Sequence, residues 1–244
     1  MKRILIVGAL AFATVAPALA ADLPPAAPPP PRAPAVYMPA PPPFSWTGFY
    51  VGLNAGGAFG STSWSTPAGS TGSFSMDGPM AGGQIGGNYQ FGAFVLGAEG
   101  DIDWQSLRGR TGAGICAPAI IGGCATASSY FATLRARGGF AADHALFYIT
   151  GGGAFTNVKP STGSLPYGGG SEAGWTAGAG IEYAFTDNWT TKIEYLYAGF
   201  QKATCNASSC SAGNAALAGG FPGVSPASVS FHENVVRAGV NYKF

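Results

Sequence analysis

The sequence predicts an all-β fold: an eight-stranded antiparallel up-and-down barrel that crosses a membrane. Three observations lead to this prediction. Seven of eight strand-like stretches alternate apolar and polar residues, aromatic residues bracket the apolar face of several stretches, and the connections alternate between short and long. Composition agrees, because 39 of 244 residues are glycine while the chain has 12 Lys or Arg and 11 Asp or Glu. A net charge near zero gives no sign of nucleic-acid binding.

The N-terminus predicts an exported protein. Residues 1–20, MKRILIVGALAFATVAPALA, carry two bases, an apolar run and a small-x-small ending, which indicates a signal peptide cleaved after Ala20. The alternative is an uncleaved anchor, but Pro17 interrupts a run that is shorter than the roughly 20 residues of a spanning helix. Residues 21–43 are rich in proline and alanine and are expected to form an extended periplasmic spacer. Residues 44–244 are interpreted as the barrel.

The strands are predicted from a two-residue period, which is typical of a strand with one apolar face. In residues 94–104, Phe94, Leu96 and Trp104 share one parity, and Glu99 and Asp101 share the other. The predicted strands are 49–59, 81–91, 94–104, 130–140, 175–185, 189–197, 234–244 and also 146–155, whose faces are both fairly apolar and are left unassigned.

Aromatic residues bracket the apolar face of four strands at an interval of ten residues. The pairs are Phe49 and Phe59, Phe94 and Trp104, Tyr130 and Phe140, and Trp175 and Phe185. Ten residues at about 3.4 Å each, tilted by about 45°, rise roughly 24 Å. Outer-membrane barrels have an apolar band about 25 Å tall with aromatic girdles at both rims. The spacing therefore favours a membrane barrel over a soluble sandwich.

The polar face carries charges of both signs, which indicates a closed interior. The ten predicted interior charges are Glu99, Asp101, Asp103, Arg135, Arg137, Glu182, Lys192, Glu194, Arg237 and Lys243. Five are acidic and five are basic, so they sum to zero. A confined interior requires such a balance, because an unpaired buried charge is very costly. The alternative is a one-sided sheet with a solvated charged face, which has no need of neutrality.

The connections predict the orientation of the barrel. Short ones follow the second, fourth and sixth strands, at 92–93, 141–144 and 186–188, whereas long loops are expected near 60–78, 105–129, 156–173 and 200–231. Short periplasmic turns and long extracellular loops are typical of outer-membrane barrels. Eight strands place both termini in the periplasm, and pairing of the last strand with the first leaves no open edge.

Four cysteines fall in two close pairs within the predicted long loops. We interpret Cys116 with Cys124, and Cys205 with Cys210, as two local disulfides of an exported protein. The alternative is a metal site, but neither pair has the CxxC spacing and no histidine lies nearby in the sequence.

No motif predicts catalysis. The sequence has no G-x-S-x-G, and its glycine runs at 151–153 and 168–170 do not precede a predicted helix, which argues against a phosphate-binding loop. His232, beside Glu233 at the predicted extracellular rim, is the one candidate for a rim-active enzyme, although a lone surface histidine more often has no such role. We expect no enzyme activity and no cofactor.

Three segments resemble a known family. Residues 46–60, WTGFYVGLNAGGAFG, residues 174–197, GWTAGAGIEYAFTDNWTTKIEYLY, and residues 237–244, RAGVNYKF, are similar to porin-like outer-membrane proteins of rhizobia and brucellae. The resemblance covers about residues 44–244 and implies an eight-stranded barrel similar to outer-membrane protein A. It also implies that the barrel-assembly machinery reads the C-terminal Phe244. The cysteine-bearing loops depart from the family pattern.

Two functions stay open at this point. The first is a structural protein of the envelope that presents loops at the surface, and the second is a porin with a narrow channel for small solutes. Eight strands leave room only for side chains, which favours the first. Inward glycines could leave water-filled space, which favours the second: Gly52, Gly56, Gly82, Gly86, Gly178 and Gly180. Expected partners are outer-membrane lipid, lipopolysaccharide and the assembly machinery, with no nucleic acid. The oligomeric state is left open.

Overall fold

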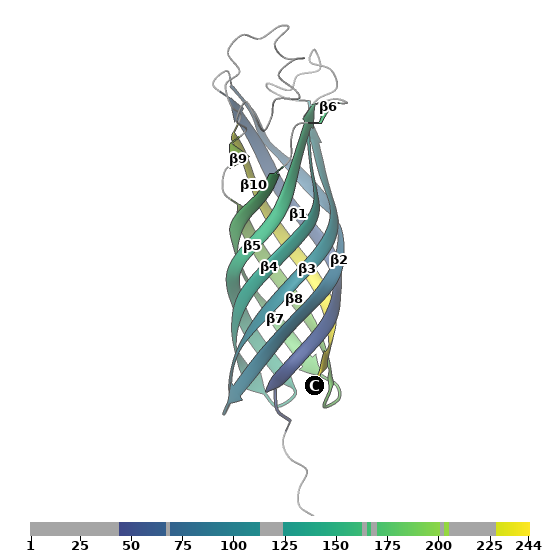
Figure 1. Cartoon of the computed structure of the whole chain (residues 1–244). Helices are drawn as coiled ribbons and strands as arrows, with labels where there is room; N and C mark the ends of the chain where they lie inside the picture. The colour runs from purple at the N-terminus through teal and green to yellow at the C-terminus, as the bar shows by residue number, and fades with distance from the viewer. Residues whose placement is uncertain are drawn as a thin grey trace, which may run out of the picture. The chain divides into compact units, whose positions relative to one another are not determined.

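The described part of the chain forms one closed antiparallel barrel (Figure 1). The computed structural model describes residues 44–66, 69–112, 124–162, 165–166, 170–200, 203–204 and 228–244. The eight long strands are β1 (Gly48–Thr66), β2 (Gly69–Phe91), β3 (Phe94–Thr111), β4 (Cys124–Ala142), β5 (Ala145–Thr162), β7 (Gly170–Ala184), β8 (Trp189–Phe200) and β10 (Ser228–Lys243). Two short strands, β6 (Leu165–Pro166) and β9 (Ala203–Thr204), pair with β5 and β10. The predicted signal peptide and spacer, residues 1–43, lie outside the described residues.

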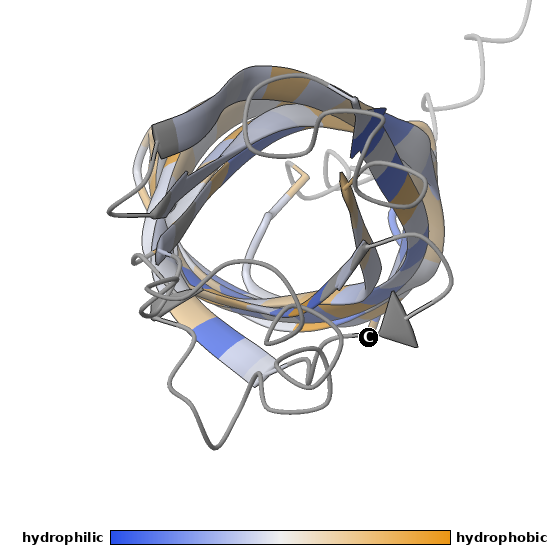
Figure 2. Ribbon diagram, turned by 90° about the horizontal axis from the view of Figure 1, so that it is seen from above, coloured by the Kyte–Doolittle hydropathy of each residue, from blue (hydrophilic) through white to orange (hydrophobic). Residues whose placement is uncertain are grey.

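Each long strand pairs with the next, and the last pairs with the first. The closing ladder runs from Tyr50 opposite Lys243 to Ser65 opposite Ser228. The backbone amide of Phe244 donates to the carbonyl of Phe49 at 2.9 Å, which extends this ladder to the last residue. Figure 2 shows the resulting ring from above. The predicted eight-stranded closed barrel is confirmed. In the described residues there is no helix long and apolar enough to cross a membrane.

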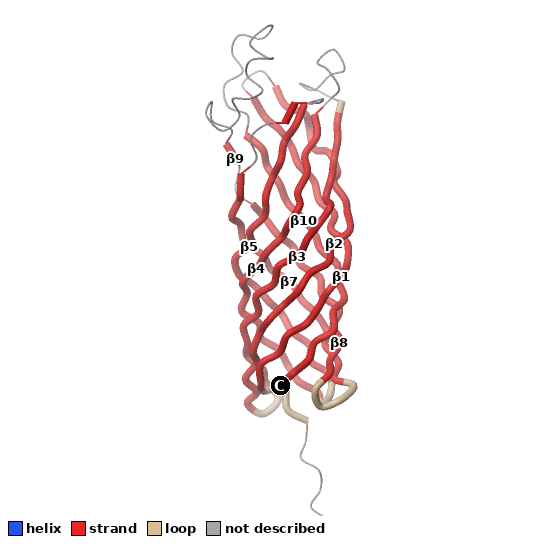
Figure 3. Tube along the Cα trace, turned by 45° about the vertical axis from the view of Figure 1, so that its right-hand side comes forward, coloured by secondary structure: helices blue, strands red, loops and turns tan. Residues whose placement is uncertain are grey.

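The short turns gather at one end of the barrel together with the C-terminus, as Figure 3 shows. They lie between β2 and β3, between β4 and β5, and between β7 and β8, at the places that the sequence predicts. Gly92 and Asp143 adopt positive φ angles of 61° and 54°, which these tight turns require. We call this the short-turn end, and the opposite end the long-hairpin end.

The strands run further toward the long-hairpin end than the sequence analysis predicts. β1 continues to Thr66 and β3 continues to Thr111, so much of the predicted loops 60–78 and 105–129 is strand. The predicted loops 156–173 and 200–231 likewise include parts of β5, β7 and β10. The predicted strands end near the outer aromatic residues that bracket their apolar faces, such as Trp104 on β3.

Between the short-turn end and these aromatic residues, the outer face of the barrel is apolar and its inner face is mostly polar. We call the part between the short-turn end and Phe59, Trp104, Tyr130, Phe155 and Trp175 the lower section. Its outward residues include Leu53, Ile85, Leu96, Leu134, Ile149, Ile193 and Val240, all exposed. On β5, whose faces were left unassigned, Ile149 points outward at 71% exposure and Tyr148 is buried.

Beyond the aromatic residues the outer face is polar, and the inner face combines apolar side chains with buried polar ones. We call this part the upper section. On β3, Ser106, Arg108 and Arg110 are exposed, while Leu107 between them is buried. On β10, His232 is exposed, while Phe231 is buried. On β3 and β10 the inward parity is the same in both sections. On β4 it changes, from odd residues such as Phe131 to even residues such as Ser128, where the register shifts between Ala127 and Phe131.

Candidate functional site

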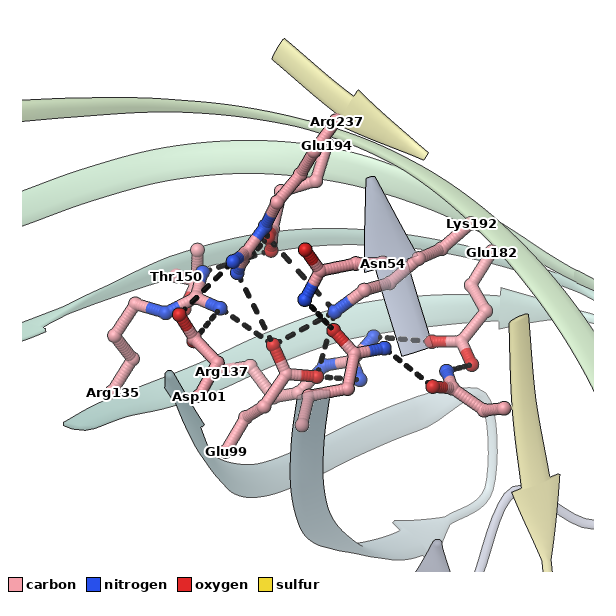
Figure 4. A network of polar contacts seen from close by, with 12 residues as sticks. Asn54, Glu99, Asp101, Arg135, Arg137, Thr150, Glu182, Lys192, Glu194 and Arg237 are labelled. Atoms are coloured by element: carbon pink, nitrogen blue, oxygen red, sulfur yellow. Dashed lines mark hydrogen bonds and ion pairs between the residues drawn. The ribbon is translucent and has the colours of Figure 1, made fainter. Parts of the chain in front are cut away.

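The middle of the lumen holds nine charged side chains, which we call the ion network. Figure 4 shows its members other than Asp103. The ion network consists of Glu99, Asp101 and Asp103 from β3, Arg135 and Arg137 from β4, Glu182 from β7, Lys192 and Glu194 from β8, and Arg237 from β10. None is more than 7% exposed. All nine are among the ten charges that the sequence analysis placed inside, and the two-residue period of five strands brings them together.

Two arginines hold the centre of the ion network. Arg135 pairs with Glu99 at 2.5 Å, with Asp101 at 2.9 Å and with Glu194 at 2.9 Å. Arg237 pairs with Glu194 at 2.8 Å and with Asp101 at 2.9 Å. Asp101 and Glu194 therefore bridge the two guanidinium groups, whose planar forks suit several carboxylates at once.

The other two bases continue the ion network toward the short-turn end. The Nζ of Lys192 lies 2.8 Å from both oxygens of Glu99. Arg137 pairs with Glu182 at 2.7 Å, and its guanidinium lies 3.9 Å from the centre of the Tyr148 ring. Each base thus has at least one close carboxylate, as buried charges require.

Neutral side chains that the sequence analysis did not single out complete the ion network. The Tyr50 hydroxyl donates to Glu99 at 2.7 Å, and the Thr133 hydroxyl donates to Asp101 at 2.6 Å. Thr190 and Asn241 donate to Glu182 at 2.6 and 2.8 Å. All four share the inward parity of their strands, and this parity is the signal that could have identified them.

Lys243 lies outside the ion network, so the prediction that it balances the interior acids is wrong. It is half-buried at the short-turn end, where its Nζ donates to the carbonyl of Ser45 and lies 4.2 Å from the centre of the Phe44 ring. Its parity is inward, but it is the last residue of β10 and lies closer to the short-turn end than the buried acids do.

Glu233 is a buried carboxylate that the sequence analysis placed only at the rim. It is 0% exposed, on the inward face of β10 in the upper section. With Glu233 added and Lys243 removed, the buried charges of the described residues are six acids and four bases. The predicted neutrality of the interior is therefore wrong for these residues, which carry two excess negative charges when all are ionised.

An apolar cluster closes the lumen on the short-turn side of the ion network. Trp46, which precedes β1, is 1% exposed and packs with Val95, Leu146 and Tyr148. Its indole nitrogen donates to the carbonyl of Asp143 at 3.2 Å, which attaches the segment before β1 to a turn. We call this the lower apolar cluster.

A larger apolar cluster lies in the lumen on the long-hairpin side. Its buried members are Ala58, Met76, Met80, Leu107, Phe131, Ala154, Val158, Leu196, Ala198, Phe231 and Val235. We call this the upper apolar cluster. The ion network thus lies between two apolar layers, which lower the local dielectric and strengthen its ion pairs.

Two of the inward glycines face a tyrosine hydroxyl where the sequence analysis considered water-filled space. A β-carbon at Gly86 would collide with the hydroxyl of Tyr50, and one at Gly180 would collide with the hydroxyl of Tyr148. At Gly56 it would meet the backbone of Val236 and Arg237. The same is true of Gly52, Gly82 and Gly178, each of which faces a neighbouring atom at short distance. All six glycines therefore admit close neighbours.

The remaining candidate residues are dispersed. His232 is exposed on the outer face, where its Nε2 lies 3.0 Å from the Ser61 hydroxyl, while Glu233 points to the opposite face. Cys124 begins β4 and is disulfide-bonded, whereas Cys116, Cys205 and Cys210 lie outside the described residues, so both pairings stay predictions. Within the described ranges there is no group of three or more His, Cys, Asp or Glu side chains arranged to hold a metal.

Comparisons with known proteins agree with this architecture. Residues 33–244 match the family model described as "Outer membrane protein beta-barrel domain". The chain is 37% identical over 220 residues to the 31 kDa outer-membrane immunogenic protein of Brucella melitensis, with 82% of this chain and 85% of that protein covered. It is 30% identical over 204 residues to the 22 kDa outer membrane protein of Rhizobium leguminosarum, with 82% and 79% covered.

Two solved barrels are also similar. Neisserial surface protein A has a TM-score of 0.42 at 18% identity, with 81% of this chain and 98% of that chain covered. The outer membrane protein OprG of Pseudomonas aeruginosa has a TM-score of 0.47 at 14% identity, with 81% and 96% covered.

Proposed function

The chain belongs to the outer membrane protein β-barrel family, and on that premise we propose that it is a structural protein of the outer membrane whose lumen is closed. The observation that carries this proposal is the filling of the lumen. The ion network has side chains from five strands, none above 7% exposure, and an apolar cluster lies on either side of it. A solute would have to displace several charge-assisted hydrogen bonds and two apolar layers.

Conductance tests this proposal directly. The refolded barrel should give no steady openings in a planar lipid bilayer, while a large porin measured in the same bilayers serves as the control for insertion. Arg237→Ala should open transient conductance, because it removes a side chain that bridges Asp101 and Glu194. Steady openings of the unaltered barrel would support the porin alternative.

The proposal places the long-hairpin end outside the cell, where relatives named as immunogenic proteins would present antigen. Supporting features are the short turns at the other end and the polar outer face of the upper section. An epitope inserted between β1 and β2 should bind antibody on intact cells. An epitope inserted at Gly92, in a short turn, should bind only after permeabilisation, and the reverse result would invert the orientation.

Lipopolysaccharide is the proposed lipid partner of the upper section. Arg108 on β3 and Lys159 on β5 lie in one row across Ala127 of β4, and Arg110 lies two residues beyond Arg108. All three bases are exposed and four or more residues past the aromatic girdle, at the height expected of phosphate groups. Replacing all three with Gln should reduce lipopolysaccharide co-purification several-fold, whereas Lys243→Gln, at the short-turn end, should not.

Phe244 is the proposed signal for the barrel-assembly machinery. Its ring is 71% exposed beside Tyr242, so it contributes little buried area to the finished fold. Phe244→Ala should therefore lower the amount of assembled barrel in cells while it leaves the urea midpoint of refolded barrel nearly unchanged. Normal assembly of this variant would exclude the role.

A further inference from the structure

We propose that the lumen contains, at the boundary between the lower and upper sections, a binding site for one divalent cation, Ca²⁺ by its ligand chemistry, formed by Glu233, Gln105 and Asp103. The inference is independent of the closed-lumen function, because an ion held at this site need not pass through the barrel. It rests on three features of the described residues: an unpaired buried carboxylate, neighbouring oxygens without donors, and an excess of buried negative charge.

Glu233 has no cationic partner within the described part of the chain. It is 0% exposed, and on the inward face of β10 it lies between Phe231 and Val235, two members of the upper apolar cluster. Its Oε2 accepts one long hydrogen bond, from Gln105 Nε2 at 3.5 Å, and its Oε1 accepts none from the described residues. A carboxylate in such surroundings is stable only when a proton or a cation compensates it.

The neighbouring oxygens on β3 also lack donors. Gln105 uses its amide nitrogen on Ser128 Oγ at 2.8 Å, which leaves its Oε1 without a partner among the described residues. Asp103, two residues away on the same inward face, accepts from Arg237 through Oδ2 at 2.6 Å, and its Oδ1 has no partner there. Each of the three side chains thus has one oxygen without a donor among the described residues. Gln105 directs its Nε2 toward Glu233, so a half-turn of its amide would present Oε1 to a cation.

The charge of the interior determines the valence of the ion. The six buried acids and four buried bases of the described residues leave an excess of two negative charges. One divalent cation restores neutrality, whereas one monovalent cation does not. The ligands are carboxylate and amide oxygens, which suit hard cations. Ca²⁺ accepts mixed oxygen ligands in irregular geometry, with water at the remaining positions, whereas Mg²⁺ requires a near-ideal octahedron.

The test uses barrel refolded from inclusion bodies into detergent, which excludes lipopolysaccharide as a source of bound Ca²⁺. Thermal unfolding is compared in EDTA and in CaCl₂, at ionic strength matched with NaCl, and calorimetric titration with CaCl₂ measures the stoichiometry. We expect one Ca²⁺ per chain, and a midpoint raised by roughly 5–10 °C at about 100-fold excess over Kd. MgCl₂ should raise the midpoint less.

Glu233→Gln supplies the decisive variant, because it keeps the shape of the side chain and removes its charge. It should lose the response to Ca²⁺ and, in EDTA, unfold at or above the midpoint of the unaltered barrel. The matched control is Glu172→Gln, on β7 in the upper section and only partly buried, which should keep the full response.

Two outcomes would overturn the proposal. If the unaltered barrel binds no Ca²⁺ and its midpoint follows ionic strength alone, a proton compensates Glu233 and there is no cation site. If Glu233→Gln responds to Ca²⁺ as strongly as the unaltered barrel, the ion binds elsewhere. The calorimetric titration of the unaltered barrel decides the first case even if the variant fails to fold.

Discussion

The lower and upper sections of the barrel place opposite side chains on the same face of the same strands. On β3, the lower section has Leu96 outside and Glu99 inside, whereas the upper section has Arg108 outside and Leu107 inside. The alternation of β3 is the same in both sections, so the difference on this strand is one of residue type, which we attribute to the surrounding medium. Lipid favours an apolar outer face and leaves charges to pair within the lumen, whereas water favours a polar outer face and an apolar core.

The largest expected effect on the free energy of unfolding comes from removing Arg237, at the centre of the ion network in the lower section. Arg237→Met leaves Asp101, Asp103 and Glu194 without one of their cations, and should destabilise the barrel by about 3–5 kcal/mol. Urea unfolding in detergent, followed by tryptophan fluorescence, measures the change. The same substitution at the exposed Arg108 should change stability by less than about 0.5 kcal/mol. Equal effects at the two arginines would contradict the division into sections.

The next effect concerns the apolar filling of the upper section. Leu107 is 0% exposed in the upper apolar cluster, so Leu107→Ala should cost about 2–5 kcal/mol through lost burial and a cavity. Leu134 points outward in the lower section at 66% exposure, and its change to Ala should cost roughly 1 kcal/mol. Urea unfolding distinguishes them, and a larger cost at Leu134 would show that the upper section has no packed core.

Two substitutions that each add one charge to the outer face of β3 can locate the boundary between the sections. Ala98 and Ser106 both point outward on β3, on opposite sides of Trp104. Ala98→Arg places a charge within the lipid-facing band and should cost about 2–4 kcal/mol in lipid vesicles. Ser106→Arg places it beside Arg108 in the upper section and should cost less than about 0.5 kcal/mol. Similar costs at both positions would place Ser106 within the lipid.

The smallest expected effect is at His232. It is exposed on the outer face of the upper section, and its hydrogen bond to Ser61 is at the surface. His232→Ala should change the free energy of unfolding by no more than about 0.5 kcal/mol. A loss above 1 kcal/mol in urea unfolding would show that the water-facing surface contributes more than this comparison allows.

The lower section could be predicted from sequence because its strands keep a two-residue period throughout. One rule then applies to all of them: apolar residues face the lipid and charged residues face the interior. The parity of Glu99 and Arg135 placed both inside, and the structure buries both. The upper section could not be predicted with that rule. Phe231 and Leu107 have inward parity, but a rule that assigns every apolar residue to the lipid ends the strand before reaching them. Parity also does not tell how far along the barrel axis a residue lies. For this reason the sequence analysis counts Lys243 among the interior charges and omits Glu233.

Contacts between strands on different sides of the lumen also could not be predicted, because the sequence analysis considers each strand separately. Arg237 on β10 meets Asp101 on β3 through the interior, although β1 and β2 separate the two strands around the ring. Such a contact depends on strand tilt and side-chain length, which the alternation does not encode. The same applies to Trp46, whose place in the lower apolar cluster depends on the turn at Asp143.

The most direct test of the change from an apolar to a polar outer face measures the depth of outward positions along β3. An environment-sensitive fluorescent amino acid at residues 96, 98, 102, 106, 108 and 110, one position at a time, reports quenching by brominated lipid and by aqueous acrylamide. We predict lipid quenching through residue 102 and aqueous quenching from residue 106 onward, with the change at Trp104. Lipid quenching that continues through residue 110, or aqueous quenching already at residue 98, would contradict the account.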